Sequence, residues 1–173
     1  MDRATESPYR ILAQGFAYPA PGRLDTLLAG LAALPDGPTK RAFGEFVRGL
    51  QPLSLGAWEE LSTHTLDLDP PAAPYVGYQT WGDSYQRGTF LATMSRTLRE
   101  SGVDPGGELP DHLAVILADL AHTTHPLPEL VEILDPAIDR IIAALRSSEP
   151  ANPYISLFEA VRAECQVLKK ENA

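Results

Sequence analysis

Hydrophobic residues recur every three or four positions along nearly the whole chain, which is the spacing of amphipathic α-helices. No segment alternates apolar and polar residues with the period of two that is typical of a strand. The sequence therefore predicts an all-α fold, a single-domain helical bundle over residues 1–173. The clearest stripe is formed by five leucines: Leu24, Leu27, Leu28, Leu31 and Leu34.

Prolines mark the expected starts of several helices. A proline in the first turn costs nothing, because the N–H that it lacks would have no partner there. Pro8, Pro136 and Pro153 each follow a residue that favours helix starts. We therefore expect Pro136 to begin a helix rather than to kink one.

The middle of the chain should hold one long helix between two irregular segments. Thr80 is the expected cap and Gly102 the expected end of this helix, with Trp81 and Tyr85 on its buried face. Residues 69–79 precede it as a proline-rich loop. Residues 102–110 follow it as a hinge-like linker, and the next helix should begin near Pro110.

Charge and cysteine content narrow the function classes. The formal net charge is −9, from 23 Asp and Glu against 14 Lys and Arg, which argues against a nucleic-acid partner. An acidic surface suits a basic peptide better, although solubility alone also explains it. The single cysteine, Cys165, lies on an apolar stripe and should be a buried core thiol rather than a nucleophile.

Neither a membrane span nor a signal peptide is expected. No apolar run approaches the roughly 20 residues that cross a bilayer. The first ten residues are polar and lack the apolar region of a signal peptide. We therefore expect a cytoplasmic protein without stable membrane insertion.

Histidines raise the alternative of a small metal-dependent hydrolase. His122 and His125 lie three positions apart and His112 lies ten positions before His122, and such a hydrolase would use His112, His122 and Asp111. However, Pro126 disfavours helical conformation at the residue before it, which weakens the pairing of His122 with His125. We expect neither a metal site nor a catalytic residue nor a cofactor.

Four aromatic residues surround the proline-rich segment: Tyr75, Tyr78, Trp81 and Tyr85. Aromatic rings with polar atoms suit a groove for a hydrophobic segment of another chain. They equally suit a loop that packs onto its own bundle. The pattern alone does not separate these two interpretations.

The segment Glu108-Leu109-Pro110-Asp111-His112-Leu113 is the most specific motif of the chain. A helix start explains most of it, because Pro110 suits the first turn and acidic residues stabilise the positive end of a helix. His112 is the residue that a helix start does not explain. An imidazole beside a carboxylate could hold a hinge or a peptide backbone.

These residues resemble the NarJ/TorD/DmsD family of redox-enzyme maturation chaperones. The 108–113 segment is similar to the family's Glu-x-Pro-x-Asp-His hinge motif, in the shorter form of the NarJ branch. Further similarities lie in the opening helix, in the mid-chain Leu-Asp before two prolines, and in an Arg-Gly pair: Tyr9-Arg10-Ile11-Leu12, Leu66-Asp67 and Arg87-Gly88.

The resemblance implies a cytoplasmic chaperone rather than an enzyme. It would bind the N-terminal segment, often a twin-arginine signal, of the catalytic subunit of a molybdenum-dependent oxidoreductase. It would assist insertion of the molybdenum cofactor before export or membrane docking. A structural accessory subunit of the redox complex is an alternative, and cofactor-biosynthesis proteins stay open as further partners.

The resemblance also implies roles for single residues. It places Pro110, Asp111 and His112 in the peptide-binding groove, and Glu108 with Pro110 at a hinge. We add the four aromatic residues to the expected peptide-binding site: Tyr75, Tyr78, Trp81 and Tyr85.

Overall fold

The computed structural model describes residues 6–173, and every regular element in that range is helical apart from one isolated bridge between Tyr75 and His112. The expected all-α, single-domain fold is confirmed. The polar residues 1–5 lie outside the described residues. The nine α-helices of the described range are α1 Pro8–Gln14, α2 Arg23–Ala33, α3 Pro38–Leu50, α4 Leu55–Ser62, α5 Val76–Trp81, α6 Tyr85–Ser101, α7 Leu113–Leu120, α8 Pro128–Ser148 and α9 Tyr154–Glu171.

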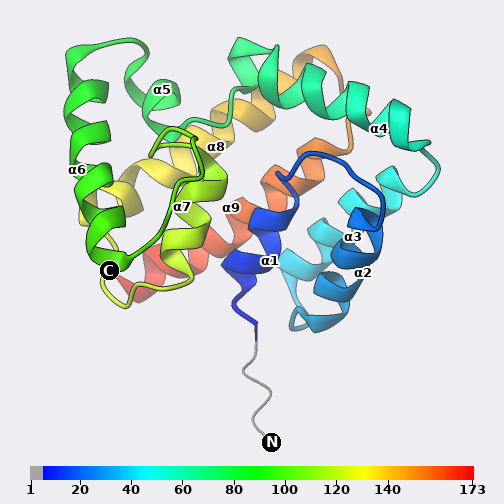
Figure 1. The fold of residues 1–173 in the computed structure, drawn as a ribbon, viewed down its shortest axis with the longest axis horizontal. Coiled ribbons are helices and arrows are strands. Elements are labelled where there is room, and N and C mark those ends of the chain that lie inside the picture. Colours follow the sequence, from blue (N-terminus) through cyan, green and yellow to red (C-terminus); the bar gives the residue numbers. More distant parts are fainter. Residues whose placement is uncertain (1–5) are drawn as a thin grey trace, which may run out of the picture.

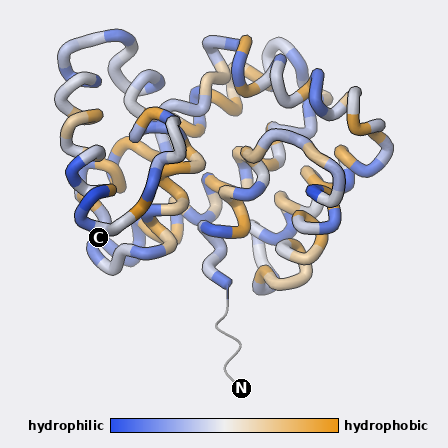
Figure 2. The backbone as a smooth tube through the Cα atoms, viewed as in Figure 1, coloured by the Kyte–Doolittle hydropathy of each residue, from blue (hydrophilic) through white to orange (hydrophobic). Residues whose placement is uncertain are grey.

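Helix α9 organises the bundle. It packs along α3 on one side and α8 on the other, while α1 lies against α7 and α9 (Figure 1). Helices α5 and α6 form the edge opposite α2 and α3 (Figure 1). Hydrophobic and hydrophilic residues alternate along the helices, as expected for helices that bury one face (Figure 2).

Aromatic residues fill the centre of the core. Phe43, Phe46, Tyr154 and Phe158 are fully buried, and the rings of Phe46 and Tyr154 lie 5.2 Å apart. The hydroxyl of Tyr154 accepts a hydrogen bond of 3.1 Å from the indole of Trp58, so its polar atom has a partner.

Cys165 is 2 % exposed and lies on the buried face of α9. Burial, together with the nearby carboxylates of Asp135 and Glu164, raises the pKa of the thiol well above its usual range. The expected core thiol is thereby confirmed.

The expectation that Pro136 begins a helix is wrong. Helix α8 begins at Pro128 and continues through Pro136 without a break. The buried stripe of Leu130 and Leu134 extends directly into Ile138 on the far side of the proline, and Pro136 itself is exposed. Burial of that continuous stripe outweighs the hydrogen bond that the proline removes.

The expected long helix is divided in two. Helix α5 ends at Trp81, Gly82 follows with a φ of 64°, and Ser84 rather than Thr80 caps α6. Trp81 therefore lies outside α6, and Tyr85 is 89 % exposed rather than buried. The expectation that Thr80 caps the long helix is wrong, because the hydroxyl of Ser84, four positions later, accepts the capping hydrogen bond from the N–H of Arg87.

Further boundaries differ around the proline-rich segment. Helix α4 passes into a π-helical turn at Thr63–Asp67, and α5 begins at Val76, so the loop is shorter than residues 69–79. Helix α7 begins at Leu113 rather than near Pro110. Gly102 ends α6 in the left-handed conformation, with a φ of 72°, which confirms the expected stop.

Even the two longest helices, α8 and α9, are amphipathic and bury one face in the bundle. Within residues 6–173, no helix combines the length and the apolar character that spanning a membrane requires.

Replacement of Pro136 by alanine should stabilise the protein. Pro136→Ala restores an N–H that can donate to the carbonyl of Glu132, and the exposed ring loses no core contact. We expect the free energy of unfolding to rise by about 1–3 kcal/mol, measured by urea denaturation. Ser147→Ala, an exposed control on the same helix, should change it by less than about 0.5 kcal/mol. A loss of stability in Pro136→Ala would show that the proline shapes the packing of α8.

Candidate functional site

Two segments far apart in the sequence pair as a short antiparallel clasp, formed by residues 74–76 and residues 111–113. The N–H of Val76 donates to the carbonyl of Asp111 at 2.9 Å, and the N–H of Leu113 donates to the carbonyl of Pro74 at 2.8 Å. The clasp fixes the end of the proline-rich segment against the start of α7.

The side chain of Asp111 connects this clasp to α6. Its carboxylate is fully buried and accepts two hydrogen bonds from the Arg87 guanidinium, at 2.9 Å from Nε and 3.3 Å from Nη2. Burial alone would lower the pKa of Arg87, but the carboxylates of Asp111 and Asp83 outweigh it and raise that pKa. Arg87 therefore stays charged, and α6, the loop and α7 meet at one bidentate ion pair.

Gly77 allows this close packing. A Cβ atom at position 77 would lie 2.8 Å from Oδ2 of Asp111 and 3.2 Å from the ring of Phe90. Both distances are shorter than ordinary van der Waals contact, so a larger residue would displace the carboxylate from Arg87.

His112 caps α7. Its Nδ1 accepts a hydrogen bond of 3.1 Å from the N–H of Ala114, and its ring meets the Tyr75 ring edge-on at 5.1 Å. Burial lowers the pKa of His112, although the charges of Glu108, Asp111 and Asp67 partly oppose this shift. The imidazole is therefore neutral near pH 7, and a free Nδ1 lone pair is what the cap requires.

The linker before α7 is tied to the same cluster. The hydroxyl of Tyr75 donates to Oε1 of Glu108 at 2.8 Å. Burial and this carboxylate raise the pKa of Tyr75, so its hydroxyl remains a donor. Glu108 thus fastens residues 102–110, an irregular connection between α6 and α7, to the clasp.

A surface cavity of about 410 Å³, which we call the tyrosine cavity, opens beside the clasp. Tyr75 and Tyr78 provide its aromatic surface, and the Arg87 guanidinium carbon lies 5.8 Å and 5.5 Å from the centres of their rings. Such distances are typical of cation–π contacts. The remaining lining residues are three carboxylates and four apolar residues: Asp67, Asp69, Asp83, Leu66, Pro70, Ala73 and Leu109.

The four aromatic residues proposed from the sequence fall into two groups. Tyr75 and Tyr78 line the tyrosine cavity. Trp81 packs inward, with its ring 5.2 Å from that of Phe90, and Tyr85 projects into solvent outside the cavity. Trp81 thus packs onto its own bundle, whereas Tyr75 and Tyr78 line an open cavity, and their part in peptide binding stays a prediction.

The motif residues lie behind the cavity rather than in its lining. Asp111 holds Arg87, His112 supports the ring of Tyr75, and Pro110 is half-buried in the turn between them and the linker. The motif does surround a helix start, but His112 is the cap, and Pro110 precedes the helix.

Sequence reasoning missed the charged lining of the cavity. Arg87 and Asp67 enter the sequence analysis only through similarities to the family, and neither they nor Asp69 and Asp83 belong to the expected binding site. Gly77 was also missed. The Arg-Gly similarity was the one available signal, because nothing in the local pattern says that Arg87 meets a carboxylate 24 positions away.

The polar atoms named for a metal-dependent hydrolase have other partners. Both carboxylate oxygens of Asp111 bind Arg87, and Nδ1 of His112 binds the backbone of α7. His122 contacts the carbonyl of Ala118 at 2.8 Å, at the end of α7. In residues 6–173, no three His, Cys, Asp or Glu side chains are grouped so as to hold a metal ion.

Comparison with known proteins places the chain in a family. Residues 38–160, which include the clasp and the tyrosine cavity, match the family model described as the nitrate reductase delta subunit. The chain belongs to this family. Its resemblance to the NarJ branch, seen first in the 108–113 motif, is thereby confirmed.

Two curated relatives of this delta-subunit family chain are the nitrate reductase-like protein NarX from two strains of Mycobacterium tuberculosis. Each is 34% identical over 110 residues, which is 63% of this chain. The matched region spans only 17% of the length of either relative. The similarity therefore concerns one part of a much longer protein.

The capping role of His112 predicts how stability depends on pH. Its pKa in the folded protein lies below the ordinary value of 6.5, so on acidification the unfolded chain binds the proton first. The neutral His112 cap therefore contributes fully to the free energy of unfolding above about pH 6.5. This contribution is lost as the pH falls through the lowered pKa of His112.

His112→Ser keeps a capping oxygen but removes the titrating group. Urea denaturation at about pH 7.5 and about pH 5.5 should therefore show a smaller loss of stability on acidification in His112→Ser than in the wild type. An equal loss in both proteins would contradict a neutral capping imidazole.

Proposed function

We propose that this delta-subunit family chain is a maturation chaperone for the catalytic subunit of a molybdenum-dependent oxidoreductase. It binds the N-terminal segment of that subunit while the molybdenum cofactor is inserted, before export or membrane docking. It acts by binding and changes no covalent bond. Family membership supports the class of client, and the tyrosine cavity is the observation that supports the binding mode.

The lining of the cavity matches an amphipathic segment. The rings of Tyr75 and Tyr78 are half-buried and present flat apolar surface for a client side chain. Asp67 and Asp69 form no ion pair within the described residues, so they are available to basic residues of the client. The recognition mode is therefore a helix or extended segment laid into a groove, with charged contacts at its rim.

The clasp gives the cavity a preformed shape. Arg87 is held by Asp111 and contacts both tyrosine rings, so the two rings keep their positions before a client arrives. Preorganised binding surfaces lose less conformational entropy on association. The hinge role of Glu108 and Pro110 belongs to the same proposal, because the bond from Tyr75 to Glu108 couples the linker to the cavity.

Titration calorimetry tests the proposal. The probes are synthetic peptides that cover the N-terminal segments of molybdenum-dependent oxidoreductase catalytic subunits from the same genome. One peptide should bind saturably, and Tyr78→Ala should weaken it about tenfold, since truncation of a central aromatic residue typically has this cost. Affinity should also fall as salt rises, because the rim contacts are between exposed charges.

A matched control is Val167→Ala, which shortens a half-exposed apolar residue on α9 outside the cavity lining and should leave affinity unchanged. Absence of binding by every peptide to the folded protein would overturn the proposal. Stoichiometric metal with hydrolase activity, or presence of the chain in the mature oxidoreductase, would instead favour the hydrolase or the accessory subunit.

A further inference from the structure

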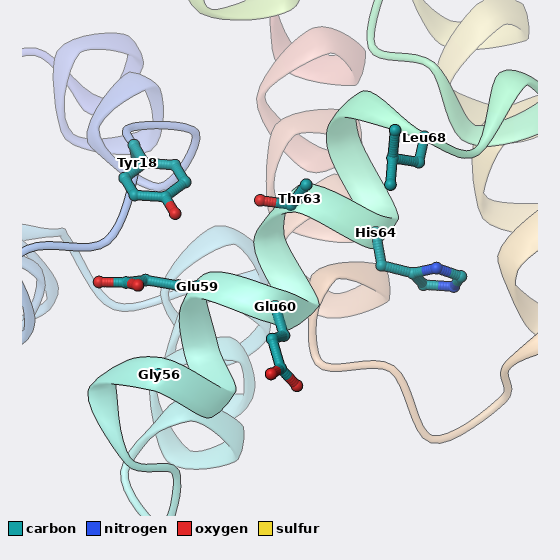
Figure 3. A pocket seen from close by; sticks show the side chains of 7 residues that line it. All are labelled: Tyr18, Gly56, Glu59, Glu60, Thr63, His64 and Leu68. Carbon is teal, nitrogen blue, oxygen red and sulfur yellow. The ribbon is translucent and has the colours of Figure 1, made fainter.

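A second hollow, of about 430 Å³, lies on the exposed face of α4, and we call it the α4 hollow. Its lining includes four residues at intervals of four, Gly56, Glu60, His64 and Leu68. Figure 3 shows Tyr18 approaching this face from the loop after α1, beside Glu59 and Thr63, whereas His64 points away from Tyr18. No residue of this hollow was part of the site expected from the sequence.

The α4 hollow and the tyrosine cavity are neighbours. Leu68 lines the hollow, and the residues on either side of it, Asp67 and Asp69, line the cavity. Consecutive Cα atoms lie about 3.8 Å apart, so the two depressions share one short segment as their common wall. A ligand that covers Leu68 therefore lies beside lining residues of both depressions.

The π-helical turn creates this arrangement. The N–H of Leu68 donates to the carbonyl of Thr63 at 3.1 Å, five residues earlier, which is the wide turn of a π-helix. Leu66 is thereby buried at 7 % exposure, while Leu68 is 69 % exposed. Such turns occur frequently at functional sites, and here the turn presents a leucine to solvent between two acidic residues.

Exposed apolar side chains gather along this path. Of seven large hydrophobic residues that are exposed in the described range, Tyr18 and Leu68 line the α4 hollow and Leu109 lines the tyrosine cavity. Exposed apolar surface that is concentrated in one place and bordered by polar residues marks interaction sites more often than scattered residues do.

Arg87 and His64 also line this path, but each is paired with a carboxylate, and the charged side chains there without an ion-pair partner are all acidic. Glu59 and Glu60 line the hollow, and Asp67 and Asp69 line the cavity. None of these four carboxylates forms an ion pair within residues 6–173. The chemistry that complements this surface is apolar in the middle and cationic on both sides.

We propose that the α4 hollow and the tyrosine cavity form one continuous groove, and that its occupant is a cationic amphipathic segment of the client. An apolar side chain of the client covers Leu68, one basic residue lies near Glu59 and Glu60, and another lies near Asp67 and Asp69. The inference rests on the proposed function, because the occupant is the client segment, and it adds a second subsite with its own charge requirement.

A fluorescent label at Leu68 tests contact with the middle of the groove. Leu68→Cys can be labelled selectively with acrylodan, because the one natural cysteine, Cys165, is only 2 % exposed. The probes are three designed amphipathic peptides of about 20 residues with an apolar centre. The two-sided peptide carries lysines on both sides of this centre, and the one-sided peptide carries them on one side only. The glutamate peptide carries glutamates in place of the lysines. The two-sided peptide should shift the emission to the blue saturably, and the glutamate peptide should not.

Acrylodan at Val167→Cys, on α9, is the matched control and should report no shift. If the two-sided peptide causes no emission shift of acrylodan at position 68, the proposal of one continuous groove is refuted.

Charge-neutral variants test the second subsite by calorimetry without a label. Glu59→Gln/Glu60→Gln should weaken the two-sided peptide about fivefold and leave the one-sided peptide unchanged, since contacts between exposed charges are individually modest. The control pair Glu100→Gln/Glu132→Gln removes two exposed carboxylates elsewhere and should have no effect.

The two proposals fail in distinguishable ways. If the client peptide depends on Tyr78 while Glu59→Gln/Glu60→Gln leaves all affinities unchanged, the second subsite is refuted and the chaperone proposal stands. If no client peptide binds the wild-type protein, the chaperone proposal itself is refuted.

Discussion

The ion pair between Asp111 and Arg87 is the interaction on which the rest of the site depends. Burial of a carboxylate is costly unless its oxygens have hydrogen-bond partners, and Arg87 donates to both oxygens of the fully buried Asp111. Loss of one partner from such a pair costs about 3–5 kcal/mol, because the other charge stays buried without compensation. This constraint explains why Gly77, which leaves room for the carboxylate, lies directly beside the pair.

The same pair connects stability with recognition. Arg87 reaches from α6 to the clasp and, on the way, contacts the rings of Tyr75 and Tyr78 that line the tyrosine cavity. His112 caps α7 with one ring atom and supports Tyr75 with its ring edge. The motif that resembles the family hinge thus acts mainly behind the surface, where it determines which side chains the surface presents.

Local patterns predicted the helical fold, the buried Cys165 and the stop at Gly102, because each depends on residues close together in the chain. They gave wrong predictions where burial, or contacts between residues far apart in the chain, determine the structure. Pro136 lies inside α8 because the apolar stripe continues past it, and Tyr85 is exposed because Ser84 caps the helix instead of Thr80. The role of Arg87 depends on its contact with Asp111, 24 positions away, which no local spacing reveals.

Hydrogen exchange tests most directly whether the ion pair holds the clasp and the cavity together. The amides of Val76 and Leu113, which make the two clasp hydrogen bonds, should be protected in the wild type and exchange much faster in Arg87→Met. The amides of α3 and α9 should keep their protection in both proteins, since these two helices pack extensively on each other. Unchanged protection of Val76 and Leu113 in Arg87→Met would contradict the account, because the clasp would then persist without the ion pair.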